Sequence, residues 1–193
     1  MQIRPLAAPG VILLASVLLA GCASGATAAN DGAAPTPATT SASSEPSAGE
    51  AAALAQAQAW LDAASVPPGA VRLEKSPIRF NSGTAWPCGP YEELRGYWLV
   101  PNTTVAAAGT WLLDNPPADL ITTHLGPLAE DGPGFDSAII GYIPAEGAQE
   151  GVVYTLAKTD ADVAIRAAVA AQTDTATCPP LPDGSMYGAP GQG

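Results

Sequence analysis

The sequence predicts a small α+β domain, an antiparallel sheet of about five strands with two helices on one face. Two observations support this prediction. Apolar residues recur at three- and four-residue spacing in two segments that each precede a proline pair, and several later segments are rich in Ile, Val and Tyr. The chain has 193 residues and is 47% hydrophobic, which is enough for one domain of ordinary size. We expect that domain to cover residues 49–178.

The first predicted helix begins with a capping box, in which Ser47 is the cap and Glu50 lies three residues later. The helix should continue to about Ala64 and end before Pro67-Pro68. Its apolar stripe consists of Ala53, Leu54, Ala57, Trp60, Leu61 and Ala64.

A second helix is predicted to begin at the cap Asn102 or Thr103. Proline cannot continue a helix, so Pro116-Pro117 should end it. One face carries Val105, Ala108, Trp111 and Leu112.

Four segments are predicted to be strands: 71–75, 94–100, 137–143 and 151–157. Residues 162–171 are ambiguous, because their alanines favour a helix while strict alternation favours a strand. We prefer the strand. The last three strands would form a meander that joins the two earlier ones.

Residues 1–21 have the organisation of a signal peptide, with Arg4 in the basic region and an apolar run from 11 to 20. That run is shorter than the roughly 20 residues that a membrane-spanning helix needs. The alternative is a cytoplasmic protein with an apolar N-terminal helix.

The tetrapeptide Leu19-Ala20-Gly21-Cys22 resembles the lipobox of bacterial lipoproteins at all four positions. The resemblance implies that Cys22 receives a diacylglycerol, becomes the new N-terminus after cleavage and carries fatty acids such as palmitate. Two acyl chains give stable anchoring, whereas one binds only marginally. The expected location is the extracytoplasmic face of the cell membrane.

Residues 22–48 would then form the lipidated N-terminus and a stalk of Ala, Ser, Thr and Pro. Such a composition cannot bury enough apolar surface to compensate for the entropy of ordering. Residues 179–193, rich in Pro and Gly, are expected to be a flexible tail.

With Cys22 assigned to the lipid, Cys88 and Cys178 remain as a pair, which we predict to form a disulfide in an oxidising compartment. A redox-active pair is the alternative, but such cysteines are usually close in sequence. The bond would join the loop around Trp86 to the end of the last strand.

Residues 67–71 and 97–101, together with Trp111-Leu112 and residues 115–118, resemble a group of exported actinobacterial proteins of unassigned function. The resemblance extends loosely over residues 60–175. It implies the same fold and no particular activity.

His124 is the only histidine, so zinc sites with several imidazole ligands are excluded and a serine triad has a single candidate base. Ser137 and Asp136 are its candidate partners, although an ordinary half-exposed histidine is the simpler interpretation. No serine lies in a G-x-S-x-G motif.

Adjacent carboxylates could serve glycoside hydrolysis or bind calcium, but solvated acids are common in turns. No EF-hand loop or nucleotide-binding motif is present. We therefore assign no catalytic residue, metal or cofactor from the sequence. The pairs are Glu92-Glu93, Glu130-Asp131 and Asp160 with Asp162.

The chain has 18 acidic and 7 basic residues, a balance that repels nucleic acid. Trp86, in a Pro-Cys-Gly-Pro loop, is a candidate exposed aromatic or a packing partner of the disulfide. The function that we expect is an anchored, non-catalytic binding or interaction module whose partner is an envelope protein or a small ligand. The alternative is an envelope hydrolase that uses His124 or an acidic pair.

Overall fold

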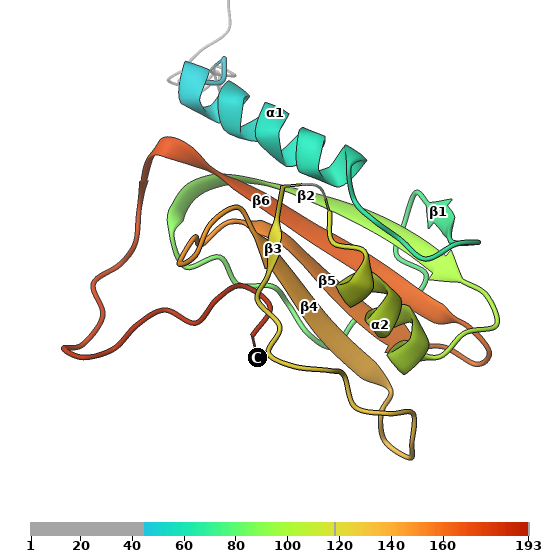
Figure 1. Cartoon of the computed structure of the whole chain (residues 1–193). Helices are drawn as coiled ribbons and strands as arrows, with labels where there is room; N and C mark the ends of the chain where they lie inside the picture. Colours follow the sequence, from blue (N-terminus) through green and yellow to red (C-terminus); the bar gives the residue numbers. More distant parts are fainter. Residues whose placement is uncertain (1–44, 118, 193) are drawn as a thin grey trace, which may run out of the picture. The chain divides into compact units, whose positions relative to one another are not determined.

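The predicted antiparallel sheet is present, with six strands in place of about five (Figure 1). The computed structural model describes residues 45–117 and 119–192, so the predicted signal peptide, Cys22 and most of the stalk lie outside the described residues. Neighbouring strands are all antiparallel, in the order β1-β2-β6-β5-β4-β3. The strands are β1 (Val71–Leu73), β2 (Gly89–Val100), β3 (Ile121–Thr122), β4 (Ser137–Ile143), β5 (Gly151–Lys158) and β6 (Val163–Thr177).

Residues 163–171 of the ambiguous segment lie in β6, so the preference for a strand is confirmed. β6 is hydrogen-bonded to β5 on one side and to β2 on the other. Both of its faces are buried as far as Ala171. This position explains the alanines, because small side chains let segments pack closely on both sides of a central strand.

The first helix, α1 (Ala48–Asp62), has the predicted capping box. The Ser47 amide donates to Glu50 Oε2 at 2.6 Å, and the Glu50 amide donates to Ser47 Oγ at 3.2 Å. The predicted stripe is correct except at Leu54, which is 44% exposed. The stripe is narrow because only Ala53, Ala57 and Leu61 turn fully into the core.

The second helix, α2 (Val105–Asp114), is capped by Thr104, one residue beyond the predicted caps. Thr104 Oγ1 accepts a hydrogen bond from the Ala107 amide at 3.2 Å. Buried residues of both helices belong to one core with alternate residues of the strands, which confirms that they cover the same face. Neither helix of the described residues is long and apolar enough to cross a membrane.

Tyr142 and Tyr154 lie at the centre of this core, and both are 0% exposed. Their rings pack edge to face with centroids 5.9 Å apart. The Tyr142 hydroxyl donates to the carbonyl of Leu112 near the end of α2, at 2.6 Å. Burial raises the pKa of both phenols, and the charge of Asp114 raises that of Tyr142 further. Tyr142 thus connects α2 to β4.

The helix-free face of the sheet is covered in part by the loop before β2. Trp86 is 7% exposed and packs with Val153 and with alanines of β6, so it is not a surface aromatic. Arg166 of β6 donates to the Ser82 carbonyl at 2.8 Å, and its guanidinium lies 5.0 Å from the centre of the Phe80 ring. These contacts attach the loop to the sheet.

The predicted disulfide between Cys88 and Cys178 is confirmed. It joins the residue that precedes β2 to the residue that follows β6, across a sequence separation of 90. Because β2 and β6 are already hydrogen-bonded neighbours, the bond closes the end of an existing ladder.

Candidate functional site

A cavity of about 750 Å³ lies between β4 and the loop that precedes it. β3 pairs with β4 only through Ile121 and Thr122, and the chain then leaves the sheet before it returns at β4 (Figure 1). The cavity occupies the space between this loop and the edge of β4. It is lined by Thr123, His124, Leu125, Pro127, Leu128, Ala129, Phe135, Ser137, Ala138, Ile139, Gly191 and Gln192.

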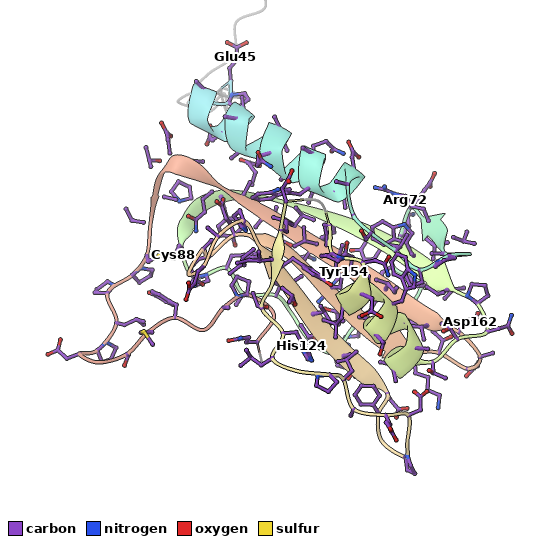
Figure 2. The ribbon with its side chains drawn as sticks, viewed as in Figure 1. Glu45, Arg72, Cys88, His124, Tyr154 and Asp162 are labelled. Carbon is purple, nitrogen blue, oxygen red and sulfur yellow. A yellow bond between two sulfur atoms is a disulfide. The ribbon has the colours of Figure 1, made fainter. Side chains whose placement is uncertain are left out.

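The structure brings two of the three candidate catalytic residues to this cavity. His124 lies two residues beyond the end of β3 (Figure 2), and Ser137 lies at the start of β4. Asp136 is not among the lining residues; its Oδ1 lies 3.7 Å from Lys158 Nζ. Within the described part of the chain, no hydrogen bond joins the His124 side chain to Ser137 or Asp136. The hydrolase therefore stays a prediction, with a histidine and a serine in one cavity as its only geometric support.

The candidate acidic pairs lie at two places. Asp131, Asp160 and Asp162 line one cavity of about 320 Å³, and Glu92 and Glu93 lie in β2. Glu92 and Glu93 belong to β2 itself, not to a turn or a strand entry, and Glu93 forms an ion pair with Arg95 at 2.6 Å. Asp131 accepts a hydrogen bond from Thr104 Oγ1, and Asp162 accepts one from the Asn102 amide. These acids serve local structure.

A smaller cavity of about 320 Å³ lies on the helix-free face of the sheet, between residues 83–87 and the C-terminal residues. Gln149 lines it and is 8% exposed, yet its Oε1 has no hydrogen-bond partner among the described atoms. Thr84 also lines this cavity, and its Oγ1 likewise has no hydrogen-bond partner among the described atoms. Water or a small neutral molecule with an N–H or O–H group would satisfy both atoms.

Residues 187–192, part of the expected flexible tail, contact the sheet between the two cavities. They form neither helix nor strand, but Thr123 Oγ1 donates to the buried Pro190 carbonyl at 2.8 Å. Gln192 Nε2 donates to the Thr123 carbonyl at 2.6 Å. Gly141 allows this approach, because a Cβ at that position would overlap the Pro190 carbonyl.

Replacement of Gly141 by alanine should therefore displace the C-terminal residues. We expect hydrogen exchange of the Gln192 amide, which donates to Ala189, to accelerate by roughly tenfold while exchange in β6 is unchanged. Amide exchange measured by NMR would show this. The matched control is Gly188→Ala, where the new methyl group meets nothing within 4 Å. Equal exchange in both variants would show that this segment does not depend on the close approach at Gly141.

Sequence reasoning identified His124 and Ser137 but missed the cavity that they share. Its apolar lining comes from Leu125, Leu128 and Phe135, which lie in a segment of turns. One signal was available, since Leu128 lies in a Pro- and Gly-rich loop and packs against the core.

No group of three or more His, Cys, Asp or Glu side chains in residues 45–117 and 119–192 could hold a metal ion. No protein-family model, curated protein or solved structure matches this chain. The function must therefore be inferred from the chain's own geometry and chemistry.

Proposed function

We propose that this protein is a lipid-anchored binding module on the extracytoplasmic face of the cell membrane, attached through Cys22. The observation that carries the binding role is the cavity of about 750 Å³ beside His124, where apolar side chains adjoin an open strand edge. Leu125 lines this cavity and is 87% exposed. A concave site lined by apolar side chains with a few polar groups is typical of a ligand-binding surface.

The proposed location is supported by the chemistry of the cysteines. Disulfides persist in oxidising compartments outside the cytoplasm, and Cys88 and Cys178 form one. Cys22 follows Leu19-Ala20-Gly21, the residues that resemble a lipobox. The chain has 18 acidic and 7 basic residues, and this negative charge disfavours binding to nucleic acid. The partner that we propose is therefore an envelope protein or a small ligand.

Replacement of Cys22 by alanine tests the anchor. We expect the variant to leave the membrane fraction or to accumulate as an uncleaved precursor, and to lose incorporation of labelled palmitate. Without a thiol at position 22 no acyl chain is attached, and the affinity for the bilayer supplied by each buried methylene, about 0.8 kcal/mol, is absent. Fractionation and intact-mass measurement would show the change.

The matched control is the double variant Cys88→Ser/Cys178→Ser, which removes the other two cysteines and should stay in the membrane fraction. Unchanged mass and fractionation of Cys22→Ala would contradict the anchor.

A further inference from the structure

We propose that the edge of β4 at Ser137–Ile139 binds an extended, Lys- or Arg-bearing segment of a partner protein as an additional strand. The inference rests on the proposed binding role and names the surface and the kind of partner. Addition of a strand to an open sheet edge is a general mode of peptide recognition.

The hydrogen-bond pattern of the sheet identifies the free groups of β4. The Lys158 amide donates to the Asp136 carbonyl at 2.8 Å, and Ser137 is opposite Ala157 in the register. Bonded and non-bonded pairs alternate in an antiparallel ladder, so the amides and carbonyls of Ser137 and Ile139 face away from β5.

The groups on that side of β4 are paired only where β3 is present. The Thr123 amide donates to the Gly141 carbonyl at 2.9 Å, which shows that odd-numbered residues of β4 face β3. Beyond Thr123 the chain leaves the sheet. Among the described residues, no hydrogen bond from another segment reaches the backbone of Ser137 or Ile139 on this side.

The opposite edge of the sheet is open as well, but its sequence protects it. β1 pairs with β2 only at residues 97–99, and the remainder of β2 contains Pro90, Glu92, Glu93 and Arg95. Proline and charged side chains are the usual means of preventing strand addition. The edge of β4 has neither, since residues 137–140 are Ser, Ala, Ile and Ile.

The cavity provides apolar contacts for the side chains of an added strand. Leu125, Phe135 and Ile139 line it alongside the free backbone groups. Leu125 is 87% exposed and Ile139 is half-buried, so both can lose further contact with water when a partner binds. A segment of three or four residues, about 10 to 13 Å long at 3.3 Å per residue, would pair with this part of β4.

The acidic residues around the cavity indicate that the partner is positively charged. No lysine or arginine lies between Arg95 and Lys158, the interval that forms α2, β3, β4 and most of β5. Glu130, Asp131 and Asp136 flank the cavity-lining residues along the chain. Among the described residues, Lys158 forms an ion pair with Asp136, which is exposed and at 3.7 Å contributes little. A segment with Lys or Arg at alternate positions would complement these acids.

The experiment uses the full chain, ¹⁵N-labelled and lipidated, in detergent micelles. The probe is the peptide acetyl-Lys-Val-Lys-Val-Lys-amide, and its acidic twin has Glu at the three Lys positions. We expect the basic peptide to shift and protect the amides of Ser137 and Ile139, with a Kd at least roughly tenfold lower than that of the acidic twin. Binding should weaken as salt is added.

Two variants test the site from different sides. Ser137→Pro removes a free edge amide that no strand uses, and proline is tolerated on edge strands. Glu130→Lys changes the charge beside the cavity at an exposed position, so it keeps the test valid if the proline variant does not fold. Each should weaken binding of the basic peptide by roughly tenfold. Glu92→Lys on the β2 edge is the matched control and should not weaken it.

The proposal is overturned if the basic peptide produces no shift, if the acidic twin binds equally well, or if both variants bind like the original protein. Protection of Ser137 and Ile139 that rises with protein concentration alone would assign the edge to a second copy of this chain, and would overturn it too. Membrane fractionation of Cys22→Ala does not involve the peptide, so the anchored location and the peptide site can fail separately.

Discussion

Replacement of Cys88 by serine is expected to lower the free energy of unfolding by about 2 to 5 kcal/mol. The disulfide joins residues that are 90 apart in sequence, so it removes a large loop-closure entropy from the unfolded chain. In the native state Cys88 is 1% exposed, and the bond closes the end of the ladder between β2 and β6. Urea unfolding of the oxidised protein and of the variant would measure the difference.

The loss of stability is expected to come from the missing bond and not from either cysteine alone. The second single variant and the double variant therefore serve as controls. Cys178→Ser should cost about the same as Cys88→Ser, and the double variant should cost little more than either one. A reductant should destabilise the original protein and leave all three variants unchanged. Additive effects of the two single substitutions would show that the cost arises from local packing.

Alkaline pH is expected to destabilise the fold steeply because Tyr142 and Tyr154 are buried together. Burial raises the pKa of both phenols in the folded state above the ordinary value near 10 that they have when unfolded. The stability that the two neutral phenols contribute is therefore fully present below about pH 10. It is lost as the pH rises towards their pKa in the folded state. In that window the free energy of unfolding should fall by about 1.4 kcal/mol per pH unit for each tyrosine.

Urea unfolding at a series of pH values from about 9 to 11.5 would measure this slope. Tyr142→Phe should remove one tyrosine's share of it. The same variant should lower stability at neutral pH by about 1 kcal/mol, because the Leu112 carbonyl loses the hydrogen bond from the Tyr142 hydroxyl. Tyr91→Phe is the control, since that residue is 37% exposed. An alkaline slope that is the same in Tyr142→Phe as in the original protein would contradict this account.

Local signals in the sequence were sufficient for most of the elements. The capping box at Ser47 and Glu50 marks the start of α1 because its hydrogen bonds are made within one turn. The alternation in residues 162–171 identified β6 because it repeats the period of a strand, even though alanine favours a helix. The pairing of Cys88 with Cys178 followed from counting, once Cys22 was assigned to the lipid.

Features that depend on distant residues were missed or misplaced. β3 contains only Ile121 and Thr122, which is too short for any periodicity, and it exists because β4 offers an edge. Trp86 is buried because the helix-free face of β5 and β6 receives it. Leu54 is exposed because the small side chains of α1 turn only a narrow stripe into the core.

The candidate site, like the fold, was predictable from the sequence only in part. The sequence by itself determined that His124, Ser137 and the neighbouring acids lie in one stretch without lysine or arginine, because charge and composition are properties of the chain. Only the tertiary structure decided that β3 ends at Thr122 and leaves the backbone of Ser137 and Ile139 facing a cavity. Strand pairing joins segments far apart in sequence, and which hydrogen-bonding groups remain free is known only when every neighbour is in place.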